Sequence, residues 1–180
     1  MGVIGKMQEQ TKRVLYGLLG MSALLGLDQL TKYLAVEKLK GRLSVPIISG
    51  VFELQYLENH GAAFGILQGK RLFLLAFTLL IFLILFVIYL RIPAGRHYLP
   101  MQFICIFIGA GALGNMVDRF IYGYVIDFFY FSLIDFPIFN VADCYVTVSC
   151  VLMLLYILFF YKEEDFSFLW RRKDKTDDSE

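Results

Sequence analysis

The chain has 180 residues, of which 58% are hydrophobic, and its mean hydropathy is +0.65. This composition is too apolar for an ordinary soluble domain of that length and indicates a membrane protein. The formal net charge of +1 argues against a nucleic-acid partner, because nucleic-acid-binding domains usually carry a basic excess.

The first apolar run follows three basic residues and predicts a membrane-spanning helix at about residues 14–36. The run is too long for the apolar part of a cleavable signal peptide, and no small-x-small cleavage site ends it cleanly. We therefore expect a retained helix. Its last part carries Asp28 and Lys32, which lie four residues apart and so on one helical face, where they can form an ion pair.

Two of the connections between helices contain strand patterns. The connection at residues 37–71 includes "VFELQYL", in which apolar and polar residues alternate with a period of two. Uncharged runs then predict helices at about residues 72–90 and 98–117. The connection at residues 118–141 includes "GYVIDFFYF", whose β-branched and aromatic residues after a glycine are typical of a strand. The two strands could form a small sheet on the membrane surface.

A fourth helix is predicted at about residues 142–161, followed by a polar tail at 162–180 whose end, "KDKTDDSE", we expect to be disordered. Residues 1–161 then form a single domain, an all-α membrane protein with four transmembrane helices. An even number of spans puts both termini on one side, which carries ten basic residues against six on the other. This bias predicts cytoplasmic termini and places the two strand-bearing connections outside.

Three aspartates, Asp127, Asp135 and Asp143, lie among apolar residues in and just after the second outer connection. Each has a structural interpretation. Asp127 could be an exposed residue of a strand, and Asp135 a turn residue in a hydrated loop. Asp143 could belong to the first turn of the fourth helix, with Asn140 as its N-cap. Spacing alone leaves these interpretations open.

A functional interpretation combines two of the three. Sixteen residues separate Asp127 from Asp143, enough for a loop to bring a strand back beside the start of a helix. Two carboxylates held together in apolar surroundings tend to share a proton. Such a pair can act as general base toward water and general acid toward a carbonyl, as in aspartic proteases. The helix dipole would favour an ionised Asp143, and burial a protonated Asp127.

Other chemistries find little support in the sequence. The two histidines are predicted on opposite sides of the membrane, which argues against a multi-histidine metal site, and the three cysteines lack CxxC spacing. Glycines in "GAGALGNMVDR" permit close helix packing. Asn115, Asp118 and Arg119 follow at the outer boundary, where an Asp–Arg pair would be structural by default. Asn59 in "ENHGAAFG" would by default be a turn residue.

Four segments, in order, resemble one family. "GNMVDRFIYGYVIDFF" followed by "FNVADCYV" is similar to the signature region of lipoprotein signal peptidase, also called signal peptidase II. "DQLTKYL" and "ENHGAAFGIL" resemble the other two characteristic segments of that family. The resemblance covers about residues 14–161. It implies an aspartic peptidase fold in which a small outer-face β-cradle and a loop helix accompany the four transmembrane helices.

The resemblance also implies roles for single residues. The catalytic pair corresponds to Asp127 and Asp143. The positions that support the site or bind substrate in the family correspond to polar residues in all four segments: Asp28, Lys32, Asn59, Asn115, Asp118, Arg119 and Asn140. No metal or organic cofactor is implied.

The activity implied by the resemblance is removal of signal peptides from diacylglyceryl-modified prolipoproteins, cutting before the lipidated cysteine. The expected location is the bacterial cytoplasmic (inner) membrane, with the active site at the outer leaflet interface. Expected partners are these prolipoproteins and membrane lipids, with no nucleic acid, and we expect a monomer. The family resemblance implies inhibition by globomycin-type cyclic peptides.

Two interpretations from other classes remain open on the sequence. A non-enzymatic proton-coupled transporter could use Asp28, Lys32 and Asp118 as a relay, because ionisable groups inside a membrane often mark pathways. The chain has no obvious inverted repeat, which weakens this interpretation. A structural assembly factor could instead use the outer sheet to bind a partner protein.

Overall fold

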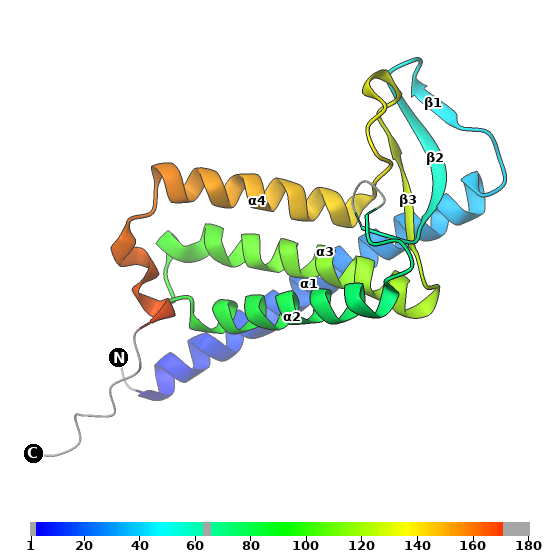
Figure 1. Ribbon diagram of the computed structural model, residues 1–180. Helices are drawn as coiled ribbons and strands as arrows, with labels where there is room; N and C mark the ends of the chain where they lie inside the picture. The colour runs from blue at the N-terminus through cyan, green and yellow to red at the C-terminus, as the bar shows by residue number, and fades with distance from the viewer. Residues whose placement is uncertain (1–2, 63–65, 171–180) are drawn as a thin grey trace, which may run out of the picture.

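Four long helices lie side by side in the computed structural model, with a small sheet at one end of them (Figure 1). The structure describes residues 3–62 and 66–170. The helices are α1 (Val3–Leu39), α2 (Arg71–Arg91), α3 (Leu99–Ile121) and α4 (Val141–Phe159). All four are long and apolar enough to cross a bilayer. The predicted four-helix membrane protein is confirmed.

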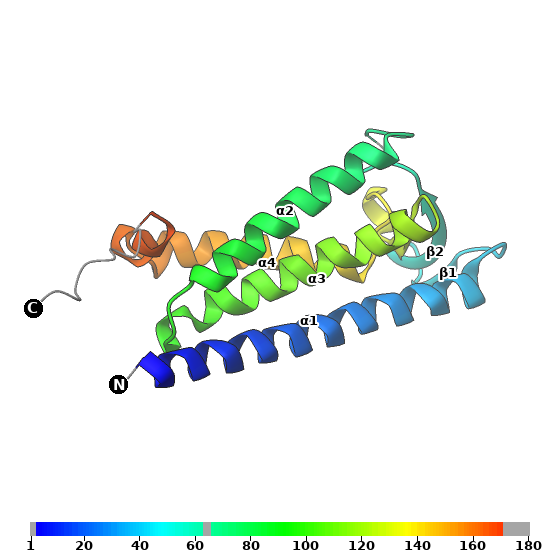
Figure 2. The ribbon, with the colours of Figure 1, turned by 90° about the horizontal axis from the view of Figure 1, so that it is seen from below.

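Helix α3 is the centre of the bundle and packs against each of the other three helices. Figure 2 shows it running between α1 and α2. Small residues permit this packing: a Cβ atom at Gly111 would lie 2.5 Å from the carbonyl oxygen of Ala142 in the first turn of α4. The backbones of α3 and α4 therefore meet directly at the end of the bundle that carries the sheet.

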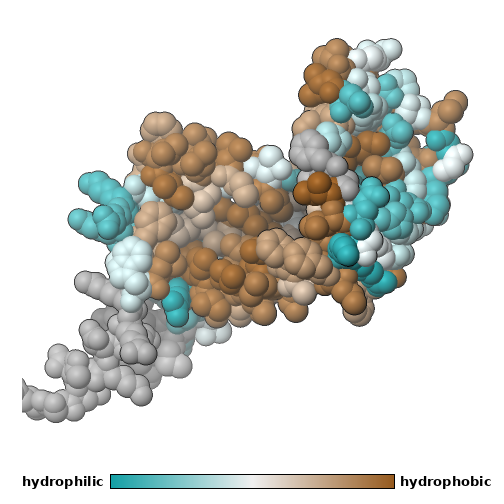
Figure 3. All heavy atoms as spheres, viewed as in Figure 1, coloured by the Kyte–Doolittle hydropathy of each residue, from teal (hydrophilic) through white to brown (hydrophobic). Residues whose placement is uncertain are grey.

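The outer faces of the helices are covered with exposed leucine, phenylalanine and isoleucine side chains (Figure 3). Examples are Leu80 and Leu83 on α2 and Leu154 and Leu158 on α4. So large an apolar surface would be unusual on a soluble monomer. In a membrane protein it is the surface that contacts acyl chains, while the helices satisfy their own backbone hydrogen bonds.

The sheet has three antiparallel strands in the order β1 (Val45–Ile48), β2 (Phe52–Asn59) and β3 (Val125–Tyr130). The two predicted strands correspond to β2 and β3, and in their register Leu57 pairs with Asp127. Strand β1 was not predicted from the sequence. This strand is short, lacks alternation and contains Pro46, which an edge strand tolerates because one of its sides has no partner strand.

Helix α1 carries the sheet at its C-terminal end. Ile126 and Phe128 of β3 are buried together with Ala35 and Leu39 of α1. The helix therefore extends past the predicted end at residue 36. It also begins at Val3 instead of residue 14, because the polar residues before the apolar run are themselves good helix formers.

The other three helices also have boundaries that differ from the prediction. Helix α2 (71–91) is one residue longer at each end than the predicted 72–90, and α4 (141–159) lies slightly earlier than the predicted 142–161. Helix α3 runs to Ile121, so Asp118 and Arg119 lie in its last turns and not in the outer connection. It ends just before Gly123, whose φ of 88° suits a glycine.

The residues after α4 turn back onto the bundle. The short 3₁₀ helix η4 (Glu163–Leu169) brings Asp165 within 2.9 Å of His97, beside the 3₁₀ turn η2 (Arg96–Tyr98). The Phe166 ring contacts the Tyr161 ring, so the start of the predicted polar tail is an ordered, partly apolar segment. The predicted disorder of 173–180 lies outside the described residues.

The helix expected in the outer connections is small in this structure. Between the ends of the four long helices, the described residues of these connections contain one helical segment, the 3₁₀ turn η3 (Ser132–Ile134). Residues 63–65 of the first outer connection lie outside the described residues.

Candidate active site

A cleft of about 490 Å³ opens where the sheet meets the ends of α3 and α4. Its walls come from the end of β2 and the following loop, the last turns of α3, strand β3, the loop at residues 136–139 and the first turn of α4. Five of the predicted site residues line it: Asn59, Asn115, Arg119, Asp127 and Asp143. The other four lie behind its wall.

Asp127 lies at the cleft with a side chain that is almost fully buried. The residue is 2% exposed, so the interpretation of a solvent-facing strand carboxylate is wrong. Its Oδ2 accepts a hydrogen bond from Asn59 Nδ2 at 3.0 Å, and its Oδ1 accepts one from Asn140 Nδ2 at 2.6 Å. Burial and the nearby charge of Asp143 raise the pKa of Asp127 to about 7, although the two amide donors oppose the shift.

Asp143 occupies the first turn of α4, in the geometry predicted from "NVAD". The side-chain oxygen of Asn140 accepts the Asp143 N–H at 3.0 Å, and Asp143 Oδ2 accepts the Asn140 N–H at 3.1 Å. This capping box satisfies two backbone donors at the start of the helix. Asn115 Nδ2 donates to the other carboxylate oxygen, Oδ1, at 2.8 Å. The capping prediction is therefore confirmed.

Asn140 connects the two aspartates. It is fully buried, and its amide donates to Asp127 while its oxygen caps Asp143. The same amide also donates to Asn115 Oδ1 at 3.1 Å. A single side chain thus fixes the position of both carboxylates relative to the start of α4.

A buried ionic cluster lies directly behind the pair. Lys32 Nζ lies 2.9 Å from Asp28 Oδ2 and 2.9 Å from Asp118 Oδ2, and the three side chains are almost inaccessible. The predicted pair of Asp28 and Lys32 is confirmed. Asp118 pairs with Lys32 and forms no ion pair with its neighbour Arg119 among the described residues.

The cluster also holds backbone groups of the elements around it. Asp28 Oδ1 accepts the N–H of Ala142, in the first turn of α4, at 2.9 Å. Asp118 Oδ2 accepts the N–H of Ile126 in β3 at 3.1 Å. Side chains of α1 and α3 therefore fix the two elements that carry the aspartates.

Lys32 also reaches the pair through Asn115. Its ammonium donates to Asn115 Oδ1 at 3.0 Å. Because that oxygen is held by Lys32, the amide nitrogen of Asn115 is directed to Asp143. Lys32 thereby orients a donor to a carboxylate that it does not itself contact.

The loop after β2 is fastened to the cleft by two predicted residues. Arg119 Nη2 donates to the carbonyl oxygen of Gly61 at 2.9 Å. Asn59 Oδ1 accepts the N–H of Gly61 at 2.9 Å, the geometry of an Asx turn. Arg119 thus brings a positive charge to the edge of the cleft.

Two polar residues that were not among the predicted site residues, Gln29 and Asp135, also have defined contacts. Gln29 was not predicted to belong to the site, yet its Nε2 donates to Asp118 Oδ1 at 2.9 Å and to Asp28 Oδ2 at 3.2 Å. Its position inside an apolar span was a usable signal, because polar side chains there need partners. Asp135 is exposed in a turn, as predicted, and does not itself line the cleft, although the next residue, Phe136, does; Tyr130 donates to Asp135 at 2.7 Å.

Comparisons with known proteins agree with this arrangement. A family model described as signal peptidase (SPase) II matches residues 21–159. A lipoprotein signal peptidase of Brevibacillus brevis is 40% identical, over 74% of this chain and 89% of the relative. One of Halothermothrix orenii is 42% identical, over 73% of this chain and 87% of the relative.

Two solved structures of bacterial membrane enzymes, determined by the in meso method, have a similar fold. One has a TM-score of 0.72 at 32% identity and covers 82% of this chain and 92% of its own. The other has a TM-score of 0.70 at 34% identity and covers 81% and 94%. The chain therefore belongs to the signal peptidase II family and is a multi-pass membrane peptidase.

Proposed function

We propose that the chain is an aspartic endopeptidase that removes signal peptides from diacylglyceryl-modified prolipoproteins, cutting before the lipidated cysteine. The observation that carries this proposal is the meeting of Asp127 and Asp143 in one cleft, joined through Asn140. Membership in a peptidase family supports hydrolysis over the transporter and assembly-factor interpretations.

In the proposed mechanism the pair holds one proton between its two carboxylates. Asp127, whose pKa is raised to about 7 by burial and by Asp143, is the protonated partner. Asp143 lies at the N-terminus of α4, where the helix dipole favours a negative charge. Asp143 deprotonates a water, which attacks the scissile carbonyl, and Asp127 protonates the carbonyl oxygen. Asp143, which now carries the proton taken from water, protonates the amine nitrogen as the C–N bond breaks, and the hydroxyl formed from the carbonyl oxygen returns its proton to Asp127.

In the proposed mechanism, polar side chains around the two aspartates hold the substrate and the neighbouring elements in position. Arg119 and Asn59 lie at the edge of the cleft and fasten the loop that follows β2. We assign them, with Asn115, to holding the substrate backbone or the loop beside it. Asp28, Lys32, Asp118 and Asn140 are positioning residues that hold α4 and β3. This set requires no metal ion or organic cofactor, so a chelator should leave the activity intact.

The location of the cleft suits a lipidated, membrane-anchored substrate. The cleft lies at the end of the bundle, where apolar helix faces give way to the more polar sheet (Figure 3). A signal-peptide helix in the bilayer could present its lipidated end at that depth, and water can reach an interface but not the hydrocarbon core. We place the cleft at the outer leaflet of the bacterial inner membrane, with both termini in the cytoplasm, from the charge bias of the connections.

The test is signal-peptide release from a diacylglyceryl-modified prolipoprotein by the purified protein in detergent. Asp127→Asn and Asp143→Asn should each reduce the rate by at least about 10²-fold, because each removes one function of the pair. Asp135→Asn is the matched control, since it makes the same change at an aspartate outside the cleft. Near-normal release by either variant of the pair would rule out the dyad.

Three further measurements test the remaining parts of the proposal. A globomycin-type cyclic peptide should inhibit release and should protect the protein against thermal unfolding. The protein should be active as a monomer in detergent. Release that is lost on chelation and restored by a divalent metal would contradict the metal-free mechanism.

A further inference from the structure

A second hollow lies at the opposite end of the bundle, between α1 and the start of α3. Its volume is about 640 Å³, and it shares no lining residue with the catalytic cleft. Its walls come from the N-terminal part of α1, the end of α2 with the turn that follows, and the first two turns of α3. We call it the α1–α3 groove. Nothing in the proposed peptidase mechanism uses it.

The rim of the α1–α3 groove is basic. Lys12, Arg13 and Arg96 line it, against a single carboxylate, Glu9. Lys12 and Arg96 are exposed, and neither forms an ion pair with another residue of the described ranges. Two cationic side chains are thus available at one rim.

Arg13 completes the rim from a fixed position. Its guanidinium donates to the carbonyl oxygens of Ile92 and of Leu90, the latter at 3.1 Å, and it lies over the Tyr89 ring. Its Nε is buried and has no hydrogen-bond partner among the described residues. Arg13 therefore holds a positive charge at a fixed place on the rim, and this charge favours an anionic ligand.

Below the rim the groove is apolar. Leu99, Phe103 and Ile106 are spaced by four and three residues, so they form one stripe along α3 that is about 10 Å long. Leu99 is 43% and Phe103 57% exposed. Tyr16 and Gly17 of α1 face this stripe across the groove. A basic rim above an apolar stripe matches a ligand with an anionic head and a hydrocarbon chain.

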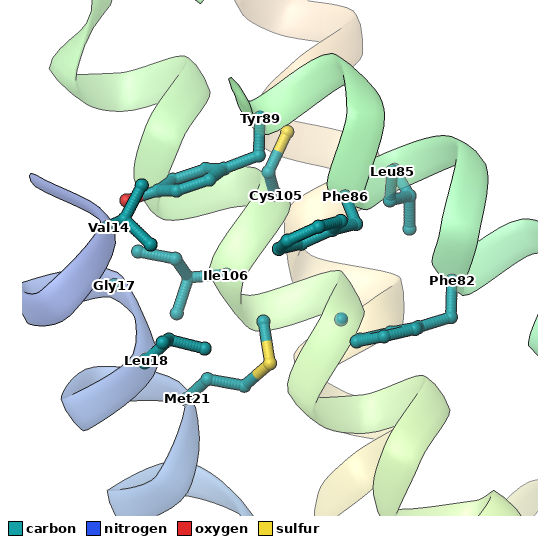
Figure 4. Close-up of a pocket in the computed structure, with 11 residues that line it drawn as sticks. Val14, Gly17, Leu18, Met21, Phe82, Leu85, Phe86, Tyr89, Cys105 and Ile106 are labelled. Atoms are coloured by element: carbon teal, nitrogen blue, oxygen red, sulfur yellow. The ribbon is translucent and has the colours of Figure 1, made fainter. Parts of the chain in front are cut away.

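A smaller cavity behind the groove does not compete for such a ligand. It measures about 20 Å³, has an apolar lining and shares Gly17, Tyr89 and Ile106 with the groove. Figure 4 shows the Tyr89 side chain reaching from α2 toward α1, and its hydroxyl donates to Arg13 O at 2.9 Å. Tyr89 thus lies between the two spaces. An apolar cavity of that size holds one water at most and remains dry.

We propose that the α1–α3 groove binds an anionic phospholipid from the leaflet at that end of the bundle. The phosphate lies at Lys12 and Arg96, and one acyl chain follows Leu99, Phe103 and Ile106. Lys12 and Arg13 lie near the start of the first candidate span and Arg96 begins the third, so the rim lies at one end of the spans, where we expect the head groups. Charge complementarity selects an anionic head group over a zwitterionic one, because each basic residue near the surface strengthens attraction to anionic lipid.

Native mass spectrometry of the full chain in detergent, titrated with phosphatidylglycerol or with phosphatidylcholine of the same acyl chains, tests the proposal. The unmodified chain should retain phosphatidylglycerol about tenfold more tightly. The double variant Lys12→Gln/Arg96→Gln should lose that preference. The control is Lys38→Gln/Arg42→Gln, which removes the same charge from exposed side chains at the opposite end and should keep the preference.

Three results would overturn the proposal. Equal retention of the two lipids by the unmodified chain would make the groove an ordinary lipid-facing surface. An unchanged preference in Lys12→Gln/Arg96→Gln would place the anionic site elsewhere. Equally tight binding of glycerol phosphate, which lacks acyl chains, would show that the apolar stripe contributes nothing. Folding of both double variants is checked by their release activity, because neither changes a residue of the catalytic cleft.

Discussion

The two ends of the helical bundle are held together by different interactions. Near the cleft the interior contains charges: Asp28, Lys32 and Asp118 are at most 1% exposed and contact one another. At the opposite end the buried cluster is mainly aromatic and aliphatic, with Tyr89 and Met101 among its members. There the charged residues Lys12 and Arg96 remain at the surface.

The two ends therefore allow apolar packing and buried ion pairs to be compared within one membrane protein. Apolar packing holds helices together but leaves the direction of single side chains weakly specified. Buried ion pairs carry a large desolvation penalty and are weak evidence for stability. Near the cleft, however, the charged groups accept the N–H groups of Ala142 and Ile126, beside each aspartate. We infer that the charges fix the geometry of the pair. The following predictions test that inference, from the largest expected effect to the smallest.

Lys32→Met should have the largest effect on stability. It leaves two buried carboxylates without their cation, and removing one partner of a buried ion pair typically destabilises a protein by about 3–5 kcal/mol. Thermal unfolding in detergent measures the change. Lys38→Met is the control, because Lys38 is exposed on the same helix and should change stability by less than about 0.5 kcal/mol.

A triple variant separates the missing charge from the missing contacts. Lys32→Met with Asp28→Asn and Asp118→Asn removes all three charges and keeps an oxygen acceptor at both acidic positions. It should recover most of the lost stability. A Lys32→Met protein as stable as the unmodified chain would show that the cluster is not what holds this end together.

Asn140→Ala should reduce peptide release by about 10²-fold, because Asp127 loses its shortest hydrogen bond and the pair loses its link. It should also destabilise the protein by about 1 kcal/mol through loss of the helix cap. Asn140→Ser distinguishes the two effects: serine caps the helix but offers no amide to Asp127. Stability should return in this variant while release stays low. Full recovery of release with serine would mean that only the cap matters.

The pH dependence of release should report the proton on Asp127. A group whose pKa is raised to about 7 is protonated below that pH, so a mechanism that needs a protonated Asp127 loses activity as pH rises through about 7. The Asn59 amide favours the ionised form. Asn59→Leu should therefore raise the pH at which activity falls, the basic limb of the pH profile, by as much as about one pH unit. Initial rates measured at steps of about half a pH unit, from about pH 5 to about pH 9, would locate this midpoint.

Glu58→Gln is the control for that shift. Glu58 is next to Asn59 in the strand but pairs with Lys40 at 2.8 Å and does not contact Asp127. Its substitution should leave the basic limb in place. A basic limb that stays fixed in Asn59→Leu would indicate that another group controls it.

Much of the fold was predictable because a bilayer imposes strong rules on composition. Apolar runs of sufficient length indicated the four helices, and a period of two indicated β2 and β3. Strand β1 was not predictable, since Pro46 and the missing alternation hide a strand at an edge. The extension of α1 to Leu39 depends on the sheet that packs on it, and this packing exists only in the folded protein.

The site was predictable only in part, because several of its contacts join residues that are distant in sequence. Asp28 and Lys32 were paired from their spacing, because four residues on a helix define a distance. The partner of Asp118 was not, because Lys32 lies on another helix and Arg119 was the nearer candidate in sequence. Spacing left Asp143 with a capping or a catalytic interpretation. The structure contains the cap together with the link to Asp127, so the two interpretations are compatible.

Asp135→Asn should have the smallest effect of all, and for that reason it sharpens the contrast between the buried network and the exposed surface. Asp135 adopts a left-handed conformation, with a φ of 47°, which asparagine tolerates as well as aspartate. Its Oδ1 accepts the hydroxyl proton of Tyr130, and an amide oxygen can do the same. Stability should change by less than about 0.5 kcal/mol, and release should be unaffected. A large loss of release would mean that this turn, and not only the pair held by Asn140, contributes to the reaction.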